Sequence, residues 1–316
     1  MNIEKIFDYA RENNISDIHL LEGEKIYFRK DGKIIEHDNY ITVSKDELLE
    51  ICNGKIEEDF AYTDSKNQRY RVNSFLTRGK LALVIRIINK EPIKLKGKFI
   101  NKLIDEKILS LKDGLVLVTG ITGSGKSTTL ANIIEKFNEN KNLKILTIED
   151  PIEYIFENKK SLIIQRELGK DIESFEKALK SSLRQDPDVI ILGEIRDEES
   201  LYSALKLAET GHLVFSTLHT MNTVESVNRL ISMVKSEKKD FIREQLASVL
   251  RFILSEELYR GKKTTPIFEV LNNTKAVANL ILNNKLNQIP TLIESGIENF
   301  MITKEKYLKN LETESD

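Results

Sequence analysis

The segment from Gly120 to Ser127 reads Gly-Ile-Thr-Gly-Ser-Gly-Lys-Ser. Glycine lets successive backbone N–H groups surround a phosphate without a Cβ atom in the way. Lys126 supplies a cation for the β- and γ-phosphates, and Ser127 offers a hydroxyl group to Mg²⁺. Residues 115–119 predict a buried strand before this segment, and residues 127–137 predict a helix whose positive end faces the anion. Strand, loop and helix in this order predict a site that binds the phosphates of a nucleotide.

Three more polar side chains follow predicted strands. Glu149 comes directly after the strand 145–148, Glu194 is the second residue after the strand 189–192, and His219 comes directly after the strand 213–218. In an open parallel sheet, ligands bind beyond the carboxyl ends of the strands, so we expect these side chains to converge on the phosphate-binding loop. Hydrolysis of a nucleotide needs a positioned metal, a carboxylate that prepares the water, and a group that senses the γ-phosphate. The three strand ends offer a candidate for each of these roles.

A second histidine, His212, precedes His219 by seven residues. This odd spacing places the two side chains on opposite faces of a regular strand. Both are candidates, and only one is expected to reach the nucleotide directly. Nothing else at ligand spacing joins them, so a metal site built from the two histidines is not expected.

Strands and helices alternate from residue 99 onward, which is typical of a parallel α/β sheet. After residue 220 we expect mainly helices, most clearly over residues 241–259, where apolar residues recur at helical spacing. Residues 1–90 predict a smaller α+β domain, with helices at 3–13 and 45–52, a hairpin at 26–36 and strands at 69–77 and 81–88. Ser44 is the predicted cap of the second helix. Residues 91–98 contain Pro92 and Gly97, lack apolar periodicity and predict a linker. We therefore expect two domains, 1–90 and 99–316, the latter with a helical C-terminal region.

The composition narrows the class of protein. The chain has 316 residues, of which 31% are charged and 40% hydrophobic, and a net charge of −2. This near-neutral charge and the lack of a basic, aromatic-rich stripe argue against nucleic acid as a partner. Cys52 is the one cysteine, so neither an intramolecular disulfide nor a cysteine-based zinc site is expected. The apolar runs are strand-sized and the amino terminus lacks the pattern of a signal peptide, which predicts a cytoplasmic protein without direct membrane insertion.

Four segments carry a family resemblance: GITGSGKST, ILTIEDPIEY, LRQDPDVIILGEIRD and AETGHLVFSTLHT. They resemble, in order and spacing, the Walker A, Asp-box, Walker B and His-box motifs of the secretion and type IV pilus ATPases. Within that superfamily the chain is most similar to the pilus retraction ATPases. The resemblance implies a RecA-like P-loop ATPase core with a smaller N-terminal PAS-like α+β domain. It also implies a homo-hexamer that uses ATP and Mg²⁺ and lies at the inner face of the cell membrane, with an inner-membrane pilus platform protein as its partner.

The resemblance further implies roles for single residues. Lys126 and Ser127 would hold phosphates and Mg²⁺, Glu149 would prepare the attacking water, and Glu194 would hold the metal shell. Because Gly193 stands where many other phosphate-loop enzymes have an acidic metal ligand, either glutamate remains a candidate base. The candidate nucleotide-binding residues are Gly120, Thr122, Gly123, Ser124, Gly125, Lys126, Ser127, Thr128 and His212. The candidate catalytic residues are Glu149, Glu194, His219, Arg71, Arg78 and Arg86, and the candidate Mg²⁺ ligands are Ser127 and Glu194.

The three arginines come from the N-terminal domain, and the resemblance implies that one or more acts across a subunit interface. The alternative is that each pairs with a local carboxylate. Arg86 interrupts an otherwise apolar strand, which predicts a buried cation, and a buried charge without a partner is costly. Its partner is therefore expected either in this chain or on another molecule.

One late segment departs from the pattern of the retraction ATPases. It reads AVANLILNNK, with Ala278 and Leu282 where those enzymes have charged residues. This leaves the coupling of ATP turnover to retraction open. The alternatives are a pilus extension, competence pseudopilus or type II secretion ATPase, a nucleic-acid translocase, and an assembly factor that binds nucleotide without hydrolysing it.

Overall fold

The computed structural model describes residues 3–30, 32–37, 42–66, 68–88, 92–261 and 264–315. The chain forms two compact units. The N-terminal unit comprises Met1–Glu91 together with Pro151–Ile155, and the C-terminal unit comprises Pro92–Asp150 together with Phe156–Asp316. Of the predicted linker 91–98, Glu91 lies outside the described residues, as does Asp31 of the predicted hairpin turn. Residues 92–97 are neither helix nor strand.

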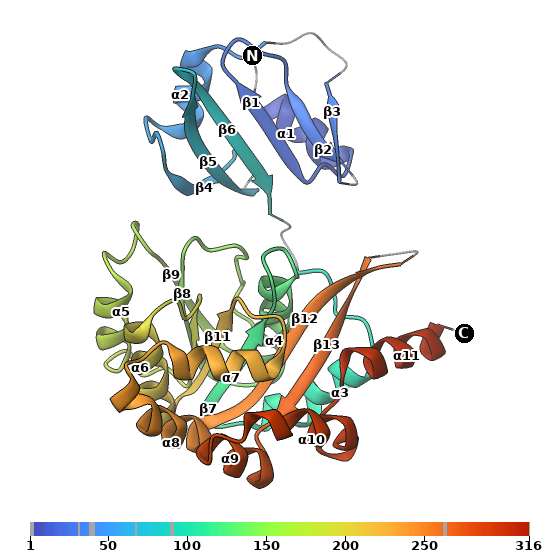
Figure 1. Ribbon diagram of the computed structural model, residues 1–316. Helices are drawn as coiled ribbons and strands as arrows, with labels where there is room; N and C mark the ends of the chain where they lie inside the picture. Colours follow the sequence, from blue (N-terminus) through green and yellow to red (C-terminus); the bar gives the residue numbers. More distant parts are fainter. Residues whose placement is uncertain are drawn as a thin grey trace. The chain divides into compact units, whose positions relative to one another are not determined.

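The N-terminal unit is an antiparallel sheet with two helices on one face (Figure 1). Phe7, Ile18, Tyr70 and Val72 are among the residues fully buried between the helices and the sheet. The predicted cap of the second helix is confirmed, because Ser44 and Glu47 form a reciprocal capping box. The helices are α1 (Ile3–Glu12) and α2 (Lys45–Cys52). The strands run in the order β3-β2-β1-β6-β5-β4, with bounds β1 (Asp17–Leu21), β2 (Tyr27–Lys30), β3 (Lys33–Glu36), β4 (Asp59–Thr63), β5 (Arg69–Thr77) and β6 (Lys80–Ile87).

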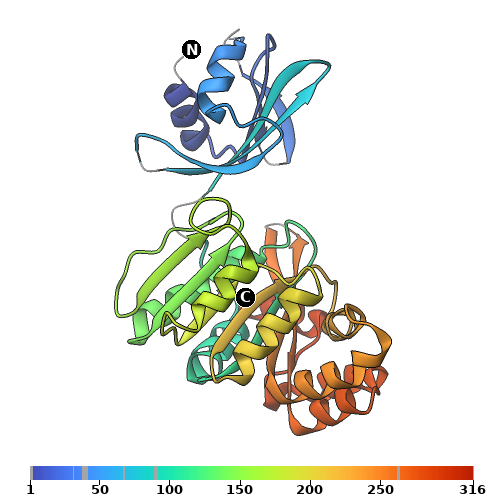
Figure 2. The same ribbon diagram turned by 90° about the vertical axis from the view of Figure 1, so that its left-hand side faces the viewer.

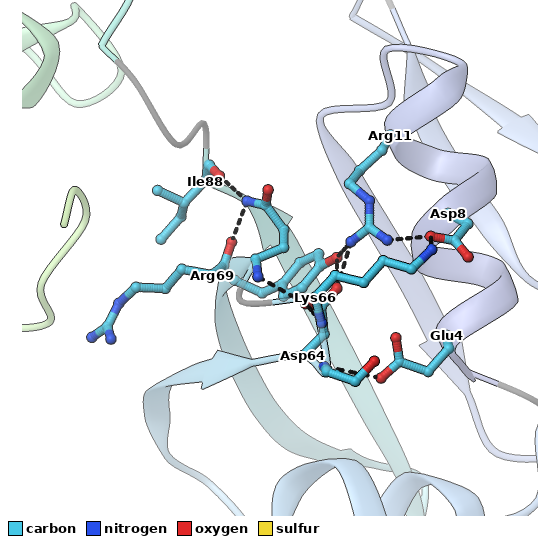
Figure 3. Close-up of polar contacts among 10 residues, drawn as sticks. Glu4, Asp8, Arg11, Asp64, Lys66, Arg69 and Ile88 are labelled. Atoms are coloured by element: carbon cyan, nitrogen blue, oxygen red, sulfur yellow. Dashed lines mark hydrogen bonds and ion pairs between the residues drawn. The ribbon is translucent and has the colours of Figure 1, made fainter.

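A partly buried polar network joins α1 to the loop between β4 and β5 (Figure 3). Arg11 donates hydrogen bonds to Asp8, Asp64 and Tyr70. The Asp64 side chain is 0% exposed and its Oδ1 also accepts from the backbone N–H of Gln68 at 2.8 Å. Burial alone would raise the pKa of Asp64, but the hydrogen bonds from Gln68, Arg11 and Tyr70 outweigh it and lower that pKa. The network therefore holds a charged carboxylate inside the N-terminal unit.

The C-terminal unit is built on a seven-stranded sheet in the order β13-β12-β7-β11-β10-β8-β9. Six strands are parallel, and β13 pairs antiparallel with β12 at one edge. The four central parallel strands end at the same edge of the sheet, which is where the sequence places its candidate residues. The bounds are β7 (Gly114–Thr119), β8 (Lys144–Glu149), β9 (Leu162–Glu167), β10 (Val189–Leu192), β11 (Leu213–Leu218), β12 (Leu250–Arg260) and β13 (Thr264–Asn272).

Helices cover both faces of this sheet (Figures 1 and 2). Successive residues of β7 face opposite layers: Leu115 and Leu117 belong to one core, and Val116 and Val118 to the other. The first core is covered by α5 (Phe175–Ser182), α6 (Glu198–Glu209), α7 (Thr223–Ser232), α8 (Lys239–Val249), α9 (Lys275–Leu282) and α10 (Ile289–Ser295). The second is covered by α3 (Lys98–Glu106), α4 (Lys126–Asn140) and α11 (Lys304–Ser315). In the parts of the chain that the structure describes, none of these helices has the length and apolar character that a membrane span requires.

The predicted helix over residues 241–259 is wrong in its second half. The helix α8 ends at Val249, and the chain continues as the strand β12. Apart from Arg251, the residues from Leu250 to Leu254 are apolar and buried between two helical layers, and a strand that is buried on both faces lacks the alternation that would distinguish it from a buried helix. After residue 220 the chain therefore forms the helices α7 and α8, then the strand hairpin β12–β13, then the helices α9, α10 and α11, so the expectation of a helical region is corrected at the hairpin.

Candidate functional site

The predicted phosphate-binding loop connects β7 to α4. Gly123 and Gly125 have φ values of 77° and 107°, in the left-handed region that glycine adopts without strain. The helix α4 begins at Lys126, whose Nζ donates to the carbonyl groups of Gly120 at 2.8 Å and Ile121 at 3.0 Å. The loop therefore surrounds the lysine ammonium group at the positive end of a helix, where a phosphate anion is stabilised. Gly120, Thr122, Gly123, Ser124 and Gly125 lie in the loop, and Lys126, Ser127 and Thr128 lie in the first turn of α4.

His219 joins this loop to a neighbouring strand end. Its Nε2 lies 3.1 Å from Oε2 of Glu194, which follows β10, and its Nδ1 lies 3.5 Å from Oγ1 of Thr122 in the loop. The other carboxylate oxygen of Glu194 pairs with Nε of Arg196, and Nη1 of Arg196 lies 3.7 Å from a carboxylate oxygen of Asp150. One imidazole thus contacts both the loop that would hold the phosphates and the acid that would act on them.

Glu149 is the last residue of β8, and hydrogen bonds fix its carboxylate. Its Oε1 accepts from Oγ1 of Thr147 at 2.6 Å and from Nε2 of Gln165 at 3.2 Å. Thr147 lies on the same strand, and Gln165 comes from the adjacent strand β9. Because β8 pairs with β10, whose end carries Glu194, the two acids belong to neighbouring strand ends. Gln165 was missed by the sequence reasoning, since β9 was not predicted as a strand.

His212 does not reach the phosphate-binding loop. It precedes the first residue of β11, whereas the loop lies at the carboxyl end of the sheet, about 20 Å away along a strand of this length. Its Nδ1 lies 3.2 Å from the carbonyl oxygen of Leu207 and 3.1 Å from Oγ1 of Thr210. The assignment of His212 to nucleotide binding is therefore wrong, because the whole length of β11 lies between the two histidines.

The three candidate arginines belong to the N-terminal unit, and two have local partners. Nε of Arg71 donates to Oδ2 of Asp59 at 3.0 Å. Nε of Arg86 donates to Oδ1 of Asp17 at 2.9 Å, so its partner lies on the adjacent strand of the same chain. Its side chain is 62% exposed, which corrects the expectation of a buried cation. Arg78 is exposed in the turn between β5 and β6, with φ at 50°.

A buried acid, Glu256 of β12, lies beside the phosphate-binding loop and was missed by the sequence reasoning. It is 2% exposed, and its Oε2 accepts from Oγ1 of Thr129 in α4 at 2.7 Å. Burial raises the pKa of Glu256 to about 8, against the opposing effects of the Thr129 hydrogen bond and the Lys126 charge. The sequence pattern that could have indicated Glu256 is the acidic pair within the apolar segment Ile-Leu-Ser-Glu-Glu-Leu. Because a helix was predicted there, Glu256 was not considered as a residue at a strand end.

The residues at the loop fit Mg²⁺, which proteins bind through one or two side chains plus phosphates and water. Ser127 is exposed in the first turn of α4, and Glu194 is 23% exposed on its side chain. When bound, Mg²⁺ would neutralise charge that develops on the phosphates. Glu194 would then give up its contact with Arg196 or with His219 in order to contact the metal. No group of three or more His, Cys, Asp or Glu side chains that could hold a metal ion occurs in the described ranges.

The fold and the loop define the core of a P-loop nucleoside triphosphatase, and comparisons with known proteins identify the family within this class. The family model "Type II/IV secretion system protein" matches residues 1–278. A type IV pilus retraction ATPase, PilT, of Pseudomonas aeruginosa is 35% identical, with 98% of this chain and 94% of that protein covered. A twitching motility protein of Neisseria gonorrhoeae is 41% identical, over 87% of this chain and 75% of that protein. A crystal structure of the pilus retraction motor PilT with bound ADP superimposes with a TM-score of 0.83 at 34% identity, covering 98% and 97% of the two chains.

This chain therefore belongs to the PilT group of the type II/IV secretion system ATPases. It is an ATPase with a RecA-like core, and the predicted fold class is confirmed. The description of the N-terminal unit as PAS-like stays a prediction.

Proposed function

We propose that this chain is a hexameric, Mg²⁺-dependent motor that hydrolyses ATP to drive the retraction of a type IV pilus. The observation that carries the hydrolytic part is the position of His219, between Thr122 of the phosphate-binding loop and Glu194 at the next strand end. The likeness to pilus retraction ATPases extends over nearly the whole chain, which supports the motor part. A motor of this kind acts at the cytoplasmic face of the membrane on a pilus platform protein, and we propose that partner and that location here.

The geometry of the site supports the roles that we propose for single residues. Loop N–H groups and Lys126 hold the phosphates, and Ser127 takes part in binding Mg²⁺. Glu149, fixed by Thr147 and Gln165, orients or deprotonates the attacking water. Glu194 takes part in the ligand shell of the metal. His219 contacts both Glu194 and the phosphate-binding loop and so fixes the position of one relative to the other.

We further propose that the site is completed by an arginine of a neighbouring subunit. Arg71, Arg78 and Arg86 are the candidates, and residues 91–98 act as the linker between the domains 1–90 and 99–316. Exchange of local partners would release Arg71 from Asp59 or Arg86 from Asp17. Arg78→Ala, Arg71→Ala and Arg86→Ala, each assayed for ATP turnover and for hexamer mass by analytical ultracentrifugation, separate a catalytic loss from an assembly loss.

Hydrolysis is tested by measuring phosphate release from ATP in the presence of Mg²⁺. We expect Glu149→Gln and Glu194→Gln each to lower kcat by about a hundredfold or more. Lys126→Ala loses the cation at the phosphates and is expected to fail already in nucleotide binding. Full turnover in both glutamate variants would contradict the proposed site. The control is Glu257→Gln, an exposed acid on β12 that pairs with Lys304.

The direction of force is tested in cells by deleting the gene and counting surface pili by electron microscopy. Excess pili that do not retract are the expected result. Cells without pili would instead assign the chain to pilus extension. Stimulation of ATP turnover by single-stranded DNA would favour a translocase over both.

A further inference from the structure

Glu256 of β12 packs directly against the phosphate-binding loop. The strand β12 runs parallel to β7 and pairs Ser255 with Thr119, the last residue of β7. β12 then continues past the end of β7, which brings Glu256 beside the start of the loop. A Cβ atom added to Gly120 would collide with the backbone carbonyl oxygen of Glu256, and one added to Gly125 would collide with its Oε1. Two glycines of the loop thus pack against the same residue.

The carboxyl group of Glu256 also holds the helix that follows the loop. Its Oε2 accepts the hydrogen bond from Thr129, which is fully buried in the first turns of α4. The loop and the start of α4 are therefore fixed to β12 by one side chain. None of the roles proposed for ATP hydrolysis uses this group.

Few charged or titratable groups face Glu256. From α4 the cation is Lys126, whose Nζ donates to carbonyl groups of the loop. From α11 the titratable group is Tyr307, which is 1% exposed and donates to the carbonyl of Lys96 at 3.1 Å. From β13, the residue opposite Glu256 is the apolar Phe268. With the side chain 2% exposed, the pKa of Glu256 near 8 reflects desolvation that Thr129 and Lys126 do not offset.

The charge state of this acid matters because the loop binds an anion. An ionised carboxylate directly beneath the loop would repel the phosphates across a region that excludes water, where charge interactions are weakly screened. A neutral carboxyl group keeps the same shape and the same hydrogen bond to Thr129 without this repulsion.

We propose that Glu256 is a positioning residue for nucleotide binding, which as a neutral carboxylic acid holds the phosphate-binding loop and the first turn of α4 without placing a negative charge beneath the phosphates. The inference rests on the nucleotide binding that the proposed function includes. Ionisation of Glu256 then competes with the nucleotide, so that binding is linked to the retention of one proton.

The test is isothermal titration calorimetry of the full chain with ADP and excess Mg²⁺, from pH 6.5 to pH 9.5. For the wild type, the Kd for ADP is expected to rise roughly tenfold between pH 8 and pH 9.5, because only the neutral form of Glu256 binds well. Glu256→Gln keeps the shape and the acceptor for Thr129, so its Kd at pH 7 stays within about twofold of the wild type and changes little with pH. Glu257→Gln, the exposed neighbour, retains the pH profile of the wild type.

A second variant tests the positioning contact without removing the acid. Thr129→Val deletes the hydroxyl donor and is expected to raise the Kd for ADP at pH 7 about fivefold, the effect of one lost hydrogen bond.

The inference is overturned if Glu256→Gln shows the same pH profile as the wild type, or if Glu256→Gln loses ADP binding at pH 7. It is also overturned if Thr129→Val binds ADP as the wild type does. Absence of ADP binding by the wild type at every pH is a different outcome: it contradicts the proposed function itself.

Discussion

Replacing Glu256 by Gln is expected to stabilise the protein, and the gain should grow with pH. Burial raises the pKa of this carboxyl group from 4.5 to about 8. Each pKa unit corresponds to about 1.4 kcal/mol, so a fully ionised Glu256 costs the folded state on the order of 4 to 5 kcal/mol. In the unfolded chain the group ionises near pH 4.5, whereas in the folded chain it keeps its proton until about pH 8. The contribution of Glu256 to the stability of the wild type therefore falls as pH rises from 4.5 to 8 and changes no further above that value.

The assay is urea denaturation of the wild type and Glu256→Gln at several pH values from 5 to 9, followed by far-ultraviolet circular dichroism. The variant lacks the titrating group, so the difference in unfolding free energy is expected to be below about 1 kcal/mol at pH 5 and to approach roughly 4 kcal/mol at pH 8. Glu257→Gln is the matched control, because that side chain is exposed and its ion pair with Lys304 contributes about 1 kcal/mol or less. A difference that does not depend on pH, or a variant that is less stable than the wild type at pH 8, would refute this reasoning.

Three other predictions test the site and the fold. His219→Ala is expected to lower kcat for ATP about a hundredfold, whereas His212→Ala, at the far end of β11, changes kcat by no more than a few-fold; equal losses in a phosphate-release assay would contradict the placement. Gly125→Ala forces a Cβ atom against Glu256 and should abolish ADP binding in calorimetry, while the double variant with Glu256→Ala recovers part of it. Asp64→Asn removes a buried charge that Arg11 needs and is expected to cost the N-terminal unit about 3 to 5 kcal/mol in denaturant unfolding at pH 7. Because the pKa of Asp64 is lowered on folding, this stabilisation is present above the ordinary carboxyl pKa and is lost in acid, so wild type and variant should converge there.

The sequence predicted well those parts of the fold that local patterns determine. The glycines and Lys126 were recognised because a bound phosphate requires residues of these types in the loop. The strand β7 was recognised because its buried apolar run has turn residues on both sides. The positions of Glu149, Glu194 and His219 followed from one rule, that parallel strands present their carboxyl ends at one edge. The order of the strands across the sheet was beyond this reasoning, because it depends on which distant segments pair.

The errors have specific physical causes. The apolar run of β12 is buried on both faces, and neither length nor periodicity distinguishes such a strand from a buried helix. That one error concealed Glu256, which is close to the loop through strand pairing and far from it in sequence. His212 was assigned wrongly for a different reason. The spacing of two histidines indicates on which face of a strand each side chain lies, but not which of them is at the end where the ligand binds.

The contacts of His219 and Arg196 have a consequence for how substitutions combine. Thr122, His219, Glu194, Arg196 and Asp150 form a continuous series of side-chain contacts across the strand ends of β7, β11, β10 and β8. Residues in one such series do not contribute independently, so the effects of two substitutions within it are expected to be non-additive. In evolutionary terms, a change at one of these positions alters which residues its neighbours tolerate, and these side chains are therefore expected to vary together rather than one at a time.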